Sequence, residues 1–225
     1  MRILFAVLRI AVAALIVAAI VGQLNLSLGY WADKGGVDVA THTVHFFSFF
    51  TIDSNLLSVV ALLIGAYLLI FRKGDNPARY NLFLAAVATY MITTGVVYNL
   101  LLRGIDLPQG STLGWSNEVL HVIAPLWLLI DWLFAPGRAP IANNQLWKIL
   151  VFPLVWCVYT LVRGPLVADT VYGNAYWYPY PFLNPNNSDE GYVTVAFYVI
   201  LITLVISAAA AGVLWVSRRR ALLRG

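Results

Sequence analysis

Uncharged stretches longer than 20 residues are the feature of this sequence that most restricts its fold. Residues 11–32, 80–102 and 191–217 contain no Asp, Glu, Lys or Arg over 22, 23 and 27 positions. A helix needs about 20 such residues to cross the hydrocarbon core of a bilayer, whereas a barrel strand alternates polar and apolar residues over about 10. These runs therefore predict membrane-spanning helices and exclude barrel strands.

The composition agrees with a membrane protein. Of the 225 residues, 61% are hydrophobic and 11% are charged, and the mean hydropathy is +0.80. In water-soluble domains about a quarter of the residues are charged. The single cysteine, Cys157, excludes a disulfide framework and a cysteine-based metal site. The net charge of +4 comes from basic residues at the ends of apolar runs, where they set topology, so nucleic acid is not an expected partner.

The apolar windows predict one all-α domain over residues 1–225, a bundle of six transmembrane helices. The expected spans are near 5–27, 45–71, 80–102, 115–135, 147–163 and 191–217. If the N-terminus is inside, only Lys34, Arg103 and Arg163 of the 14 basic residues face outside. The positive-inside rule therefore predicts that both termini are cytoplasmic.

Three of the spans carry a charged residue inside the apolar run, namely Arg9, Asp53 and Asp131. An isolated charge in hydrocarbon is costly, so each of them needs a partner or water. Arg9 and Asp131 fall at similar depth near the inner side and are expected to form a structural ion pair. Asp53 is expected to pair with Arg163.

The outer connection over residues 164–190 is long for a compact bundle and is rich in aromatic residues. Its aromatic run contains Trp177, Tyr178, Tyr180 and Phe182. Loops of this length are commonly lids or binding elements, and aromatic side chains also gather at the headgroup level of membranes. The loop is therefore either a lid over a site in the membrane or part of an aromatic belt.

Polar residues of two spans fall at one depth in the outer half of the membrane. Thr51, Ser54 and Asn55 occupy positions i, i+3 and i+4 and share one helix face, while Asn117 and His121 are an i, i+4 pair. A hydroxyl face can therefore meet an imidazole face, which is what nucleophilic catalysis requires. The alternative is that these groups only hydrogen-bond between helices.

The depth of this layer is expected from a continuous second span over 45–71. In such a helix, Thr51 lies about 9 Å below His45, which marks the outer mouth of the site.

Several short motifs are spread over the second to fifth spans and the last outer loop. They are Phe49-Phe50-Thr51 with Ser54-Asn55-Leu56, Asn117-x3-His121-x3-Pro125, Asp131-Trp132, Tyr159-Thr160-x2-Arg163-Gly164 and Tyr178-Pro179-Tyr180-Pro181-Phe182. Together they resemble a bacterial six-pass membrane family that is distantly similar to the androgen-induced and ADTRP-type transmembrane threonine hydrolases. The eukaryotic members of that group cleave fatty acid esters of hydroxy fatty acids.

The resemblance implies an integral membrane lipid esterase of the bacterial plasma membrane. Thr51 matches the nucleophile and His121 matches the base. The candidates for donating to the oxyanion or orienting the imidazole are Ser54, Asn55, Asn117 and Glu118. No metal or organic cofactor is expected, and the expected partners are membrane lipids and a lipid ester substrate that enters from the bilayer.

Two other functions fit the same residues. The first is a non-enzymatic membrane protein that binds a lipid, a quinone or a small solute in an outer-leaflet cavity. The second treats His45 and His121 as axial ligands of a haem or a metal. With three His residues and no clustered carboxylates, this second alternative has the weaker support.

Overall fold

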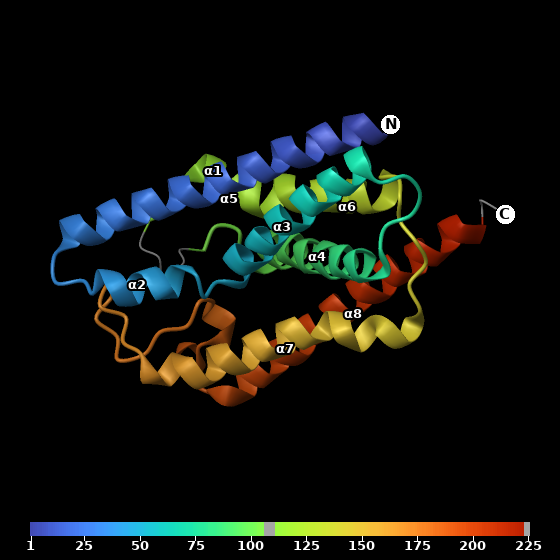
Figure 1. Ribbon diagram of the computed structural model, residues 1–225. Helices are drawn as coiled ribbons and strands as arrows, with labels where there is room; N and C mark the ends of the chain where they lie inside the picture. The colour runs from blue at the N-terminus through green and yellow to red at the C-terminus, as the bar shows by residue number, and fades with distance from the viewer. Residues whose placement is uncertain (106–110, 223–225) are drawn as a thin grey trace.

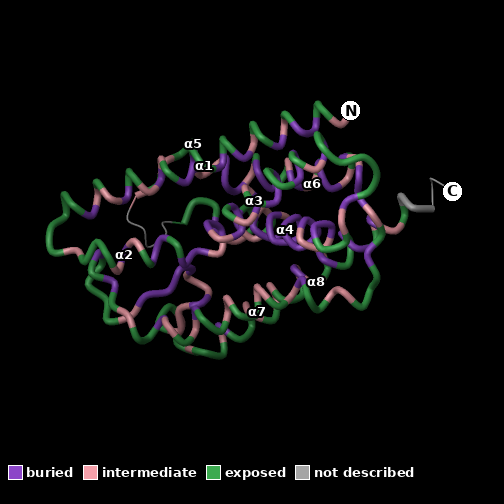
Figure 2. The backbone as a smooth tube through the Cα atoms, in the orientation of Figure 1, coloured by how far each residue is buried: buried purple, intermediate pink, exposed green. Residues whose placement is uncertain are grey.

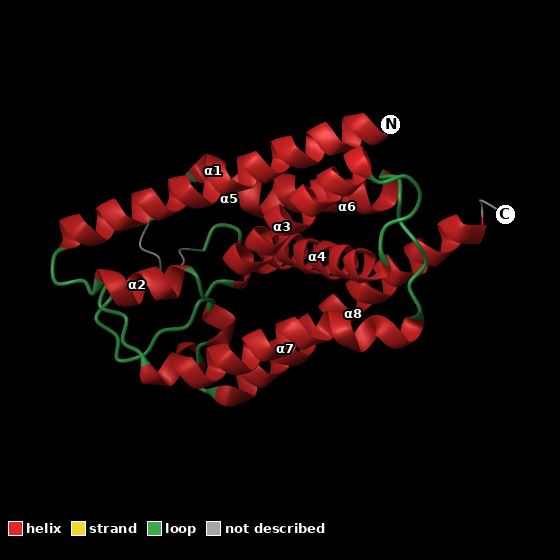
Figure 3. Ribbon diagram, viewed as in Figure 1, coloured by secondary structure: helices red, strands yellow, loops and turns green. Residues whose placement is uncertain are grey.

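The computed structural model describes residues 1–105 and 111–222, and the chain is helical over most of this part (Figure 3). No β-strand occurs within these two ranges. Six helical segments are long and apolar enough to cross a membrane, as the sequence predicts. They are Arg2–Lys34, Phe50–Phe71, Ala78–Leu102, Gly114–Phe134, Asn143–Leu166 and Tyr192–Arg219.

The segments are labelled in chain order, with η for short 3₁₀ and π turns. Their bounds are α1 Arg2–Lys34, α2 Val39–Phe46, α3 Phe50–Phe71, α4 Ala78–Val97, η1 Tyr98–Leu102, α5 Gly114–Glu118, η2 Val119–Ile123, α6 Ala124–Phe134, η3 Asn143–Gln145, α7 Leu146–Arg163, η4 Gly164–Leu166, η5 Pro181–Leu183, η6 Pro185–Asn187 and α8 Tyr192–Leu222.

The helices form an elongated bundle with α4 at its centre (Figure 1). Both chain ends lie at one end of the bundle, together with the α3–α4 and α6–α7 connections, whereas the long loop over residues 167–191 lies at the other end. Helix α4 contacts α3, α6, α7 and α8 and is mostly buried, while α7 and α8 expose much of their surface (Figure 2). An apolar surface of this kind suits contact with lipid.

The second span differs from the prediction, because residues 45–71 do not form one helix. A turn separates α2 from α3, which begins at Phe50. In this turn the Ser48 hydroxyl donates to the backbone carbonyl four residues earlier, and such side-chain bonds compete with helix continuation. His45 therefore belongs to a separate short helix, and the expected 9 Å offset does not apply. Thr51 lies in the first turn of α3.

A buried ion pair joins α1 to α6 near the end of the bundle that carries the chain termini. Nε and Nη2 of Arg9 each donate to one carboxylate oxygen of Asp131 at 2.8 Å, and both side chains are at most 1% exposed. Two parallel bonds of this type satisfy both charges where water is absent. Gly65 of α3 makes room for the pair, because a Cβ there would overlap Nη1 of Arg9 and the hydroxyl of Tyr80.

The other expected ion pair is not formed. Among the residues that the structure describes, no ion pair joins Asp53 to Arg163. The Arg163 guanidinium lies over aromatic rings instead, 5.4 Å from the ring centroid of Trp177 and 6.0 Å from that of Tyr159. Cation–π contacts with Tyr159 of α7 and with Trp177 of the 167–191 loop therefore replace the predicted partner.

We expect Gly65→Ala to destabilise the protein by about 1–3 kcal/mol, because the added methyl group overpacks the buried ion pair. Thermal unfolding in detergent measures the change. Gly29→Ala is the matched control, since a Cβ at Gly29 meets nothing within 4 Å and alanine favours a helix. Equal melting temperatures for Gly65→Ala and the unmodified protein would contradict this account.

Candidate active site

Thr51 and His121 are in hydrogen-bond contact where α3 meets the π turn η2. Oγ1 of Thr51 lies 3.2 Å from Nε2 of His121, and each residue is 7% exposed. The two side chains therefore face each other between the second and fourth spans, as the sequence analysis expects. Burial removes competing water from this hydroxyl–imidazole pair.

The second ring nitrogen of His121 fixes the direction of this hydrogen bond. Nδ1 lies 3.0 Å from the backbone carbonyl oxygen of Asn117. A carbonyl only accepts, so Nδ1 carries the proton and Nε2 presents its lone pair to Thr51. The Thr51 hydroxyl then donates to Nε2. This is the arrangement in which an imidazole acts as base toward a hydroxyl.

The predicted orienting side chains lie elsewhere. Glu118 forms a half-exposed ion pair with Arg103 at 2.8 Å, and the Asn117 side chain donates to the hydroxyl of Tyr98. The orientation of His121 therefore comes from the backbone of Asn117 and not from either of these side chains. The i, i+4 spacing does place Asn117 next to the imidazole, but the contact is made by its backbone carbonyl and not by its side chain.

Two π-helical turns frame the imidazole. Turn η2 contains His121, and turn η1 contains Tyr98, whose ring stacks on the imidazole with centroids 3.9 Å apart. Pro125 lacks an N–H group and so cannot bond the carbonyl of His121 four residues earlier. The amide of Asn99 donates to that carbonyl at 3.3 Å instead. Such π turns are frequent at functional sites.

The polar residues next to Thr51 on α3 bond to the backbone and do not point at the Thr51 hydroxyl. Nδ2 of Asn55 donates to the carbonyl of Thr51 at 2.8 Å and to that of Leu120 at 3.2 Å. Oγ of Ser54 contacts the Thr51 carbonyl and Oγ1 of Thr94, each at 3.1 Å. Both were candidate oxyanion donors, but their geometry ties the first turn of α3 to its neighbours.

Tyr180 of the 167–191 loop contacts Thr51 directly. Its hydroxyl oxygen lies 3.2 Å from Oγ1 of Thr51 and 3.2 Å from the backbone nitrogen of the same residue. From the sequence, Tyr180 belongs to a loop that is either a lid or part of an aromatic belt. Nothing in its local spacing indicates this contact, because 129 positions separate it from Thr51 in the chain.

The other residues of the expected lid divide between two roles. Phe182 lines the cavity described below together with Tyr180. Trp177 instead stacks on His45, with ring centroids 4.1 Å apart and an interplanar angle of 7°. Tyr178 packs so closely on Gly164 that a Cβ at that glycine would overlap its ring. Trp177 and Tyr178 therefore dock the loop, and Tyr180 and Phe182 face the site.

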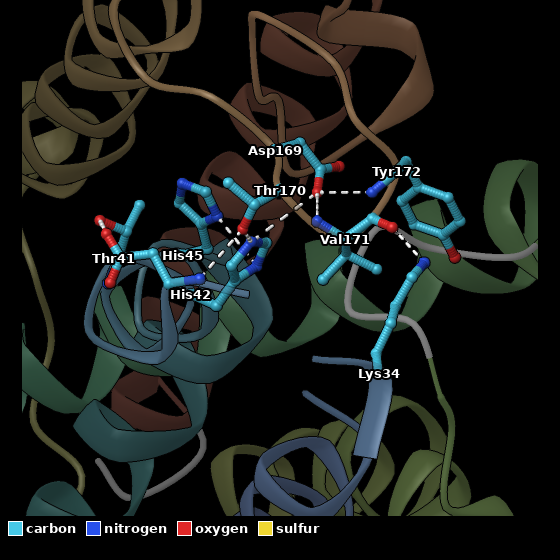
Figure 4. A network of polar contacts seen from close by, with 9 residues as sticks. Lys34, Thr41, His42, His45, Asp169, Thr170, Val171 and Tyr172 are labelled. Carbon is cyan, nitrogen blue, oxygen red and sulfur yellow. Dashed lines mark hydrogen bonds and ion pairs between the residues drawn. The ribbon is translucent and has the colours of Figure 1, made fainter. Parts of the chain in front are cut away.

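A polar network fastens the beginning of this loop to α2 (Figure 4). Nε2 of His42 lies 3.0 Å from Oγ1 of Thr170 and 3.9 Å from the Asp169 carboxylate. Nδ1 of His42 faces Nδ1 of His45 at 3.4 Å, and Lys34 donates to the carbonyl of Val171. The loop is thus held at several points.

Both histidines of this network are buried, which favours their neutral form. Burial lowers the pKa of His42, and it lowers the pKa of His45 to about 3; the nearby charge of Arg163 lowers the pKa of His45 further.

His45 and His121, the candidate axial ligands of a haem or a metal, contact different residues, and both ring nitrogens of His121 are hydrogen-bonded. In the described part of the chain, no three His, Cys, Asp or Glu residues gather as metal ligands do.

An apolar cavity of about 160 Å³ begins at Thr51 and extends between α4, α7 and α8. Its lining residues are Phe50, Thr51, Thr93, Thr94, Val97, Tyr98, Leu102, Leu150, Pro153, Leu154, Trp156, Cys157, Tyr180, Phe182, Leu183, Val199, Ile202, Thr203 and Ile206. Asn55 and Asn117, two of the candidate donors to the oxyanion, are not among these residues, because both amides are turned toward backbone or tyrosine partners. Thr51 lies at the wall where the cavity meets the hydrogen-bonded imidazole.

We expect Asn55→Leu to lower the free energy of unfolding by about 1–2 kcal/mol, because two backbone carbonyls lose their buried amide donor. Thermal unfolding of the detergent-solubilised protein measures the change. Asn187→Leu is the control, since the Asn187 amide donates to the Pro181 carbonyl on the exposed surface of the loop, where water replaces the bond, so its loss should be smaller. Equal losses of unfolding free energy for the two variants would show that the buried bonds of Asn55 contribute no more than an exposed bond.

Comparison with known proteins gives no match: no family model, no curated protein and no solved structure matches this chain. Function is therefore inferred from the chemistry of the contacts around Thr51. Those contacts join a buried hydroxyl, an oriented neutral imidazole and an apolar cavity.

Proposed function

We propose that this protein is an integral membrane esterase that hydrolyses lipid esters, with Thr51 as nucleophile and His121 as general base. One observation carries the proposal: a hydroxyl 3.2 Å from an imidazole nitrogen, with the other ring nitrogen bonded to a carbonyl, at the wall of an apolar cavity. A purely structural threonine has no need of the cavity, and a lipid-binding cavity has no need of the oriented imidazole.

The reaction follows from the direction of the hydrogen bonds. Oγ1 of Thr51 attacks the ester carbonyl carbon while its proton passes to Nε2 of His121. The tetrahedral intermediate then breaks its bond to the alcohol oxygen, which receives the proton from His121. Water attacks the acyl-threonine by the same route, releasing the fatty acid and restoring the Thr51 hydroxyl.

The first turn of α3 supplies a donor for the charge that develops on the carbonyl oxygen. The backbone N–H groups of a first helical turn have no intrahelical partner, and the helix dipole is positive at this end. The N–H of Thr51 lies beside its own hydroxyl and donates to the Tyr180 oxygen, a partner that it can exchange for an oxyanion. Such preorganised donors usually give the largest catalytic contribution.

The cavity indicates the kind of substrate. Its lining is mostly aliphatic and aromatic, which suits a fatty acyl chain and not a charged molecule. Leu154, one of the lining residues, is 56% exposed on the lipid-facing side of α7, so a chain can enter from the bilayer. Fatty acid esters of hydroxy fatty acids, the substrates of the hydrolases that the sequence resembles, are the first compounds to test.

A second candidate is a non-enzymatic protein that binds a lipid, a quinone or a small solute. The same apolar cavity favours it, because binding needs no reactive hydroxyl. The two candidates differ in one property: only the esterase forms a covalent adduct at Thr51.

We infer further that both termini are cytoplasmic and that the protein lies in a bacterial plasma membrane. The two chain ends lie at the same end of the bundle, and the basic residues concentrate there. Thr51 and the 167–191 loop then belong to the outer half of the membrane.

We expect Thr51→Ala and His121→Ala each to lower ester hydrolysis by about 10³-fold or more, because nucleophile and base act as a unit. A fluorophosphonate probe should label Thr51 of the unmodified protein, with fluoride as the leaving group, and mass spectrometry locates the adduct. Thr160→Ala is the control, since Thr160 is buried but lies outside the cavity lining. Labelling that persists in Thr51→Ala would exclude Thr51 as nucleophile.

The orientation has its own test. Reporter fusions at Asn143 and at the C-terminus should give a cytoplasmic signal, and a fusion at Asn174 in the long loop should give an external one, because the basic residues are retained inside. A cytoplasmic signal at Asn174 would reverse the orientation and place Thr51 in the inner half of the membrane.

A further inference from the structure

We propose that Tyr180 is a third catalytic residue, whose O–H group stabilises the negative charge that forms first on Oγ1 of Thr51 and then on the carbonyl oxygen of the substrate. This inference rests on the proposed hydrolysis. It assigns a chemical role to a loop residue that the sequence indicates only as part of a lid or of an aromatic belt.

The hydrogen-bond directions leave one choice for the Tyr180 proton. Nδ1 of His121 donates to a carbonyl, so Nε2 accepts and the Thr51 hydroxyl proton points at it. Oγ1 of Thr51 can then only accept from Tyr180, at 3.2 Å. The Tyr180 oxygen in turn accepts from the Thr51 backbone N–H, also at 3.2 Å. The chain of donors runs from Tyr180 to Thr51 to His121.

No other side chain competes for this role in the two described ranges. Besides His121, only Tyr180 hydrogen-bonds to Oγ1 of Thr51. The amides of Asn55 and Asn117 and the hydroxyl of Ser54 are bonded to other groups. The residues that spacing suggested as oxyanion donors are therefore occupied, and a residue from the distant loop takes their place.

Tyr180 is in the protonated state that a donor requires. Its side chain is almost fully buried, and burial raises the pKa of Tyr180 to about 12, with the carboxylate of Asp53 acting in the same direction. The hydroxyl therefore keeps its proton throughout the neutral range. A neutral, desolvated phenol is a strong donor to an oxyanion.

The position of the phenol is fixed before substrate arrives. The Tyr180 ring contacts the rings of Phe49, Trp156 and Phe182, with centroids 5.3–5.9 Å apart. Proline stands on each side of Tyr180 in the sequence and restricts the backbone. Little reorganisation is then needed at the moment of reaction, which is the condition under which such donors act best.

During acylation the Oγ1–carbon bond forms, the carbonyl π electrons move to the oxygen, and the Thr51 proton goes to His121. The Tyr180 O–H turns from Oγ1, which has become an ester oxygen, to the new oxyanion, and it keeps its own proton. The Thr51 N–H exchanges the phenol oxygen for the same oxyanion. Collapse of the intermediate returns both donors to their first partners.

Tyr180→Phe tests the inference, because it removes one hydroxyl and retains the ring. We expect kcat for a long-chain p-nitrophenyl ester to fall by about 10²–10³-fold, the usual loss for one oxyanion donor, with KM nearly unchanged. Tyr176→Phe is the matched control in the same loop, since Tyr176 lines no part of the cavity at Thr51. Its kcat should remain that of the unmodified protein.

A second measurement separates a catalytic role from a structural one. An alkyl trifluoromethyl ketone forms a tetrahedral adduct with the nucleophile, so Tyr180→Phe should weaken its binding by about the factor lost in kcat/KM. The matching alkyl ether, which forms no oxyanion, should bind both proteins equally. Unchanged ketone binding and unchanged kcat in Tyr180→Phe would overturn the inference, whereas equal losses for ketone and ether would assign Tyr180 a packing role only.

If Tyr180→Phe does not fold, a fluorotyrosine at position 180 gives the decision, because it keeps the shape and lowers the pKa of the phenol. The fall in the rate of ester hydrolysis at alkaline pH should then begin at lower pH. An unchanged pH dependence would contradict the inference. Failure of the fluorophosphonate probe to label Thr51 in the unmodified protein would overturn the proposed hydrolysis and this inference together. Normal labelling with an unaffected Tyr180→Phe overturns the role of Tyr180 alone.

Discussion

The structure depends on one constraint: inside a membrane, backbone N–H and C=O groups must find partners within the protein. Regular helices satisfy the constraint along most of the chain. Around Thr51 the regular pattern is interrupted, at the turn between α2 and α3, at the π turn η2 and at Pro125. Side chains supply the missing bonds, from Asn55 to the Leu120 carbonyl and from Asn99 to the His121 carbonyl.

The interruptions of the helices, and the hydrogen bonds that compensate for them, also form the site around Thr51. The break before α3 leaves the N–H of Thr51 outside the helical pattern, where Tyr180 accepts it. The π turn holds His121 so that its Nδ1 bonds the Asn117 carbonyl and its Nε2 faces the hydroxyl. The same bonds that satisfy the backbone in an apolar medium therefore align the hydroxyl, the imidazole and the phenol.

The sequence predicts what depends on helical periodicity and charge. The six spans, the approach of Thr51 to His121 and the pairing of Arg9 with Asp131 all follow from residues at fixed spacing or depth. The roles of Asn55 and Tyr180 do not, because an amide or phenol can bond several groups and its choice is set by distant segments. Apolar residues continue through the turn before Phe50, so hydropathy does not mark that break.

The exposed side of the cavity affects how this protein meets its ligands. Leu154 lines the cavity and also faces the surroundings of α7, so the cavity and the hydrocarbon phase share a boundary. For the proposed lipid substrate, access to Thr51 is then by diffusion in two dimensions, and the quantity that would set occupancy is the mole fraction of the lipid in the bilayer or micelle. Added detergent dilutes the lipid in that phase even when its concentration in the whole solution is constant.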